Sequence, residues 1–98
     1  MQVILSERVK TALATLSRDD RDRVNTWFGY LANWEQDPFV KAQSVRLDMT
    51  GQTVYLFRTS TDVRIFYTVD EQKHALFVLD VTTKDTILNS GTISTGGS

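Results

Sequence analysis

Residues 54–82 read VYLFRTSTDVRIFYTVDEQKHALFVLDVT, and this stretch decides the fold. Segments rich in β-branched and aromatic residues follow one another in it, which predicts three strands, at 54–59, 63–69 and 75–82. The polar links between these segments are short, and short links join antiparallel neighbours. The third segment is apolar on both faces, which is typical of a central strand that helices cover on one side. We therefore expect a three-stranded antiparallel meander.

Two groups of apolar residues upstream of the meander recur with the spacing of one helical face: Val9, Ala12, Leu13 and Leu16, then Val24, Trp27, Phe28 and Leu31. Ser6 precedes the first group and Ser17 the second, and serine hydroxyls at such positions cap free backbone N–H groups. The second helix is expected to end before Asp37-Pro38, because proline disfavours helical backbone in the preceding residue. With Val3–Leu5 as a first strand, the predicted order is strand, helical hairpin, meander.

The segment between hairpin and meander is less regular, with a helical turn predicted at Phe39–Gln43 and an extended segment at Ser44–Met49. Trp34 and Tyr30 lie one step off the helical stripe, and they either mark a docking surface or cap the edge of the core. We favour the cap. The sequence thus predicts an α+β fold, with two helices on one face of a four-stranded, mainly antiparallel sheet. A single domain is expected over residues 1–88, followed by a disordered Gly/Ser/Thr-rich tail at 89–98.

Composition excludes several classes of function. The chain has no cysteine and a single histidine, His74, which argues against disulfide frameworks, zinc ribbons, thiol nucleophiles and histidine-based triads. No cofactor or metal is expected, no apolar run is long enough to span a membrane, and a cytoplasmic protein is expected. Lysine and arginine number 11 against 12 acidic residues, a net charge of −1. Any nucleic-acid binding must therefore depend on a local basic cluster.

The meander resembles the core of the RelE/ParE toxin superfamily. Val54–Arg58 and Val63–Tyr67 are similar to two neighbouring strands there, each of which carries an arginine. Ala75–Lys84 is similar to the strand that follows, and Arg46-Leu47 to the lysine and leucine before the family's glycine turn. The resemblance covers residues 2–88, and it depends on the order and spacing of motifs that are each degenerate.

This resemblance implies the toxin of a type II toxin–antitoxin pair, neutralised by an antitoxin protein wrapped over its surface. Members of the RelE branch cleave messenger RNA at the ribosome without a metal, and members of the ParE branch poison DNA gyrase. RNA cleavage through the 2′-hydroxyl builds negative charge on a phosphate, so it needs cations beside that phosphate and groups that move protons. The oligomeric state does not follow from the sequence.

Three basic residues are the candidate catalytic set. Arg64 matches the family's meander arginine, and its guanidinium fork suits two phosphate oxygens. Arg58 and Lys84 would assist, although Lys84 replaces a family arginine and lacks the fork. The alternative reading pairs Arg64 with a nearby carboxylate, that of Asp62, Asp80 or Glu71, and gives Arg58 an ion pair within the sheet.

The departures from the family weaken the nuclease reading. Nuclease members carry lysines on the strand that matches Val54–Phe57, and here that strand is apolar. No tyrosine follows Lys84, so Tyr55 and Tyr67 are the nearby phenols that could replace it. A tyrosine on a strand is, however, more often a half-buried packing residue with its hydroxyl at the rim. Loss of one preorganised charge stabiliser costs roughly a hundredfold in rate or more. Two hypotheses therefore stay open: a toxin acting on translation or gyrase, and a non-catalytic protein-binding module that kept the fold.

Overall fold

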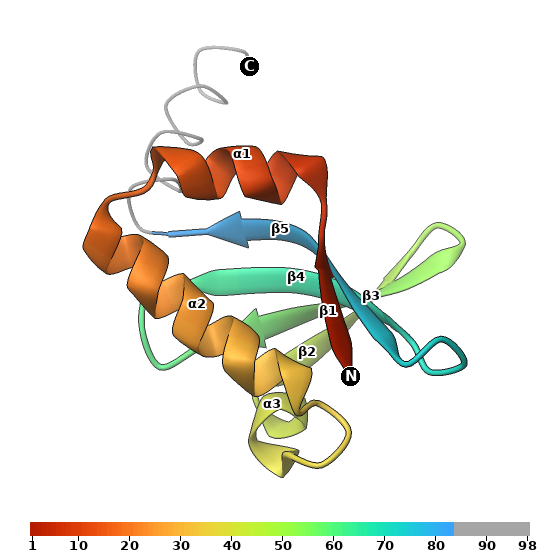
Figure 1. Cartoon of the computed structure of the whole chain (residues 1–98). Helices are drawn as coiled ribbons and strands as arrows, with labels where there is room; N and C mark the ends of the chain where they lie inside the picture. The colour runs from red at the N-terminus through yellow and green to blue at the C-terminus, as the bar shows by residue number, and fades with distance from the viewer. Residues whose placement is uncertain (84–98) are drawn as a thin grey trace.

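The computed structural model describes residues 1–83, which form three helices and five strands (Figure 1). In chain order the elements are β1 (Gln2–Leu5), α1 (Glu7–Thr15), α2 (Arg18–Ala32), α3 (Pro38–Ala42), β2 (Ser44–Met49), β3 (Gln52–Arg58), β4 (Arg64–Asp70) and β5 (Ala75–Thr82). The predicted α+β fold with a strand, a helical hairpin and a meander is confirmed. Lys84, the remainder of the predicted domain to residue 88, and the predicted tail at 89–98 lie outside the described residues.

The strands form one sheet in the order β1-β5-β4-β3-β2. β1 runs parallel to β5, and the other neighbours are antiparallel. Within residues 1–83 the sheet has five strands where four were expected, because Ser44–Met49 pairs with β3 along its whole length. Gly51, with φ +71°, lies in the turn between those two strands, where a side chain would strain the backbone.

Short-range hydrogen bonds set where the helices begin. Ser6 Oγ accepts from the Val9 amide at 3.2 Å, and Ser17 Oγ accepts from the Asp20 amide at the same distance. Both predicted caps are confirmed. Asp37, the residue before α3, caps this helix: its carboxylate accepts a hydrogen bond from the Phe39 amide at 2.9 Å. Pro38 is the first residue of α3, where its missing N–H has no intrahelical partner to lose.

The helices cover one face of the sheet and leave the other open (Figure 1). Side chains alternate between the faces along each strand, so cross-strand partners share a face. On the helix-side face Phe57, Ile65, Tyr67 and Val78 are fully buried, and they pack with Val9, Val24, Leu31 and Val40 of the helices. Val45, Leu56 and Phe66 are successive partners on the open face.

The two aromatic residues left open by the sequence both belong to the edge of the core. Trp34 is only 9% exposed and lies in the core cluster. Tyr30 is 40% exposed, but its ring centroid lies 5.2 Å from that of Trp27 and 5.7 Å from that of Phe39. The cap interpretation therefore describes these residues better than an exposed docking patch. No helix within residues 1–83 is long and apolar enough to cross a bilayer.

Candidate functional site

Two of the three predicted basic residues meet at one end of the open face. Arg58 ends β3 and Arg64 begins β4, and the register makes them direct cross-strand partners. Both side chains line a cleft of about 330 Å³ together with Ala42, Gln43, Val45 and Thr59. The backbone amide of Arg58 donates to the Gln43 carbonyl at 2.9 Å, which ties the cleft to the link between α3 and β2.

Arg64 is held by the loop that precedes it. Its Nη1 donates to the carbonyl of Thr61 at 2.8 Å and to that of Val63 at 2.9 Å. The hydroxyl of Thr59, itself buried, donates to the Val63 carbonyl at 2.7 Å and so fixes the loop. The remaining N–H groups of the guanidinium have no hydrogen-bond acceptor among residues 1–83 and stay available to a ligand in the cleft.

Two of the three carboxylates suggested as partners of Arg64 form ion pairs with other arginines. Asp62 forms an ion pair with Arg23 at 3.7 Å, and Asp80 forms one with Arg8 at 3.7 Å. Arg64 hydrogen-bonds backbone carbonyls instead, and Arg58 forms no ion pair within the described part of the chain. Within residues 1–83, neither arginine therefore forms the ion pair of that alternative.

The charges at this cleft favour an anion. Like charges directly opposite each other destabilise a sheet, and Arg58 and Arg64 are such a pair. A phosphate or carboxylate between them would relieve the repulsion through charge-assisted hydrogen bonds. The six lining residues include no acid or histidine that could transfer a proton near neutral pH. The cleft can hold an anion and stabilise developing negative charge, but its own lining cannot move protons.

Neither candidate phenol reaches the cleft. Tyr55 and Tyr67 are cross-strand partners on the helix-side face, opposite to Arg58 and Arg64. Tyr67 is fully buried; its hydroxyl accepts from Trp34 Nε1 at 3.1 Å and lies 2.7 Å from Ser44 Oγ. Burial raises the pKa of Tyr67 above its ordinary value. Strand alternation turns both tyrosines away from the arginines, so they have the packing role and not the place of a catalytic tyrosine at this cleft.

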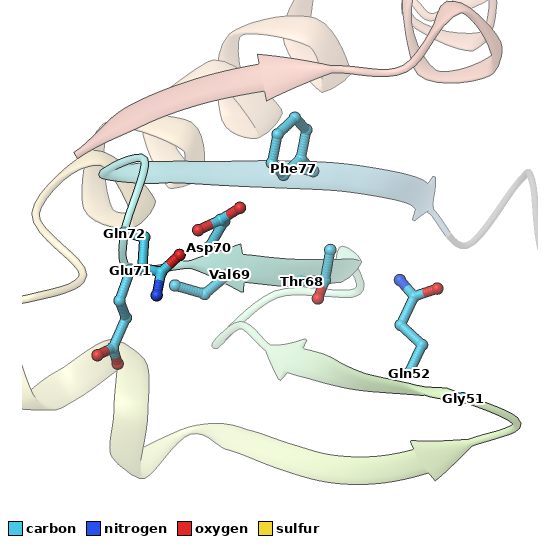
Figure 2. A pocket seen from close by; sticks show the side chains of 8 residues that line it. All are labelled: Gly51, Gln52, Thr68, Val69, Asp70, Glu71, Gln72 and Phe77. Atoms are coloured by element: carbon cyan, nitrogen blue, oxygen red, sulfur yellow. The ribbon is translucent and has the colours of Figure 1, made fainter.

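The middle of the open face is apolar, as the composition of Val54–Phe57 indicated. Val54 and Leu56 point to this face, and Val45 beside them is 41% exposed. At the far end from Arg58 lies a second hollow, of about 500 Å³ (Figure 2). Its lining includes the carboxylates of Asp70 and Glu71 and the amides of Gln52 and Gln72. The open face therefore changes from cationic to acidic along its length.

Sequence reasoning missed the contribution of Ala42, Gln43 and Val45 to the cleft. Gln43 reaches it because α3 places the start of β2 beside Arg58. The sequence around Gln43 contains no motif that predicts its contact with Arg58, since this contact depends on how the edge strand β2 pairs. The histidine, His74, lies far along the chain at the β4–β5 turn and contacts Glu35 at 3.4 Å, outside the cleft lining. Within residues 1–83 no cluster of histidine and acidic residues could hold a metal ion.

Comparison with solved structures identifies a known fold. The chain superimposes on RelE in an archaeal RelE–RelB complex from Pyrococcus horikoshii OT3 with a TM-score of 0.64 and 22% identity, over 85% of this chain and 93% of that one. The match to the intact E. coli RelBE toxin–antitoxin complex has a TM-score of 0.63 and 18% identity, over 84% of this chain and 94% of that one. The match to the isolated E. coli RelE toxin has a TM-score of 0.64 and 18% identity, over 95% of both chains. No protein-family profile and no curated relative matches the sequence. The chain has a RelE-like fold.

Proposed function

We propose that this protein is the toxin of a type II toxin–antitoxin pair. The observation that carries the proposal is the likeness to RelE toxins, which extends over nearly the whole of both chains. Two of the matching structures are complexes of RelE with its antitoxin. By analogy, the partner of this chain is an antitoxin protein that covers its surface. Fold likeness alone does not assign a reaction; the chemistry depends on the side chains that line the cleft.

The cleft between Arg58 and Arg64 supports an RNA target in preference to gyrase. Arg58 and Arg64 share one face and form no ion pair within residues 1–83, and two such guanidinium groups are suited to a backbone phosphate. Arg64 is oriented by the loop that binds its Nη1. In this proposal Arg64 holds the scissile phosphate, Arg58 shares the charge, and Lys84 assists from beyond the described residues. Since the lining lacks a proton-transfer group, cleavage would be slow unless the messenger or ribosome contributes one.

Growth is the first test. Expression of the full chain from a tight inducible promoter in bacteria, without any antitoxin, is expected to arrest growth within a few generations. Restored growth on co-expression of a short acidic partner encoded next to it would identify the antitoxin. Normal growth despite accumulation of folded protein would contradict the toxin assignment.

Variants then separate RNA cleavage from other modes of toxicity. Arg64→Ala and Arg58→Ala are each expected to reduce messenger cleavage on ribosomes by roughly a hundredfold, because each removes a preorganised charge stabiliser. Arg64→Lys keeps the positive charge but loses the guanidinium hydrogen bonds to the loop, so it separates the effect of charge from that of orientation. Arg18→Ala removes an exposed arginine of α2 and is the matched control. Toxicity that survives both alanine variants, with gyrase supercoiling inhibited, would replace the RNA target by gyrase.

A second function is favoured by the apolar open face. Val45, Leu56 and Phe66 form a row where cationic residues would serve nuclease chemistry, and exposed apolar surface marks protein-binding sites. The protein is then a non-catalytic binding module that kept the toxin fold. This alternative predicts no growth arrest, together with stable binding of the neighbouring partner by the purified chain. Leu56→Lys would abolish that binding, while Arg64→Ala would leave it intact.

A further inference from the structure

A third hollow lies on the helix-side face of edge strand β2 and is separate from the arginine cleft. It has a volume of about 280 Å³ and is lined by Trp34, Lys41, Ser44, Arg46, Tyr55 and Tyr67. Strand alternation produces it: Ser44 and Arg46 point to this face, whereas Val45 between them points to the open face. α3 contributes Lys41, and the chain after α2 contributes Trp34.

At the floor of this hollow, the polar side-chain groups are hydrogen-bonded to one another in a chain. Trp34 Nε1 donates to the Tyr67 hydroxyl at 3.1 Å, and Ser44 Oγ donates to the Val40 carbonyl at 2.7 Å. The Tyr67 hydroxyl therefore donates to Ser44 Oγ, 2.7 Å away. The ring of Tyr55 stacks on that of Tyr67 with centroids 5.3 Å apart and an interplanar angle of 21°. The floor is thus ordered before any ligand arrives.

Two cations flank this aromatic floor. Lys41 Nζ lies 4.5 Å from the centroid of the Trp34 ring and forms no ion pair within residues 1–83. Arg46 uses Nε on Asp48 at 3.0 Å, which leaves its two terminal amino groups without an acceptor in the same part of the chain. Both side chains are exposed. The hollow therefore combines a half-buried tyrosine ring with two charged donors at the rim.

We infer that this hollow binds a nucleotide, with the phosphate between Lys41 and Arg46 and the base against Tyr55. Phosphate is the anion that an ammonium and a guanidinium share well, and nucleobases stack on tyrosine rings. Its volume lies near the lower end of the roughly 300–1,000 Å³ usual for small-ligand sites. An acidic peptide without an aromatic residue would satisfy the cations but would leave the tyrosine surface without a planar partner.

The ligand has two sources, a free nucleotide or one residue of a single-stranded RNA. The hollow and the arginine cleft lie on opposite faces of one edge strand, β2. Ala42, Gln43 and Val45 line the cleft, while Lys41, Ser44 and Arg46 line the hollow. The inference concerns binding by the purified chain and does not depend on the proposed toxin function.

The two tryptophans provide a local test. In the nuclear magnetic resonance spectrum of the ¹⁵N-labelled full chain, AMP is expected to shift the indole N–H signal of Trp34 in a saturable way. The signal of Trp27, which packs in the core against Phe57, is expected to stay in place. Inorganic phosphate and the peptide Glu-Phe-Glu serve as competitors. The inference would be overturned if inorganic phosphate shifted the Trp34 signal as much as AMP does at the same concentration, or if the peptide bound more tightly than AMP.

Variants and a longer ligand complete the design. Lys41→Ala and Arg46→Ala are each expected to weaken AMP binding roughly tenfold, since each removes a charged contact. Tyr55→Leu tests the stacking surface, and Arg18→Ala is the matched control with unchanged affinity. A tetranucleotide RNA that binds at least tenfold more tightly than AMP identifies single-stranded RNA as the source, and equal affinity identifies the free nucleotide. Unchanged affinity in both cation variants would refute the site whatever the outcome of the growth test.

Discussion

At the scale of single residues, Tyr67 is a strand residue whose side chain stabilises the fold. Its hydroxyl links Trp34 after α2 to Ser44 at the start of β2, two segments that are distant from it in the chain. The described residues contain no buried side-chain polar atom without a partner. Because the phenol is engaged on both sides and buried, it cannot serve the arginine cleft on the other face.

Tyr67→Phe is expected to lower the free energy of unfolding by about 1–3 kcal/mol, since the Trp34 N–H and the Ser44 hydroxyl each lose a buried partner. Urea denaturation measures the change. Tyr30→Phe, at a ring 40% exposed, is the control and should stay within about 0.5 kcal/mol of the parent. A loss no larger than that of the control would show that the hydroxyl contributes little.

The same residue predicts an alkaline pH dependence. Burial raises the folded-state pKa of Tyr67 above the ordinary value of about 10. A group whose pKa is raised on folding contributes its full stability below the unfolded pKa and loses it as the pH rises through the folded pKa. The parent should therefore lose stability above about pH 10, and Tyr67→Phe should lose less over the same range. Parallel pH–stability profiles for the two proteins would contradict this.

At the scale of elements, helix starts were the easiest features to predict because they depend on neighbours in sequence. Ser6 and Ser17 cap α1 and α2 as expected. α3 and β2 were harder. α3 spans five residues, too few for a periodic pattern, and β2 became part of the sheet only through its pairing with β3. The cleft and the hollow both border this segment, so the least predictable elements are the ones that shape the sites.

Ser17→Ala is expected to cost about 1 kcal/mol of stability, because the Asp20 amide loses its acceptor. Ser17→Asp keeps an acceptor and should restore most of the loss. Ser6→Ala should cost more than Ser17→Ala, since the Ser6 hydroxyl also donates to the Leu79 carbonyl at 3.3 Å. Thermal unfolding of the three variants checks the order, with Ser60→Ala in an exposed loop position as control. Equal costs at both caps would exclude a role for the Leu79 contact.

At the scale of the whole molecule, one core joins all the layers. Its buried members come from all three helices and from β3, β4 and β5. Trp27 and Trp34 both belong to it, so tryptophan fluorescence reports on the same unit that circular dichroism does. The two probes are expected to give coincident urea transitions. Separate midpoints would show that the helices and the sheet unfold independently.

Charge is also organised at this scale. The net charge of −1 hides a local excess, since Lys41, Arg46, Arg58 and Arg64 surround the start of β2. The carboxylates of Asp70 and Glu71 line the hollow at the other end of the open face. A basic cluster of this kind is what nucleic-acid binding requires of a chain without overall positive charge. Composition could not reveal it, because the four cations come from four elements, α3, β2, β3 and β4.

The sequence by itself determined the meander, the helical hairpin and the helix caps, because alternation, helical periodicity and capping act between near neighbours. It also singled out Arg58 and Arg64. Only the tertiary structure decided that these two share a cleft, that Tyr55 and Tyr67 face the opposite side, and that Lys41 and Arg46 line one hollow with an aromatic floor. The physical reason is that strand register and edge pairing arise from contacts between distant segments. A shift of one residue in register would exchange the two faces.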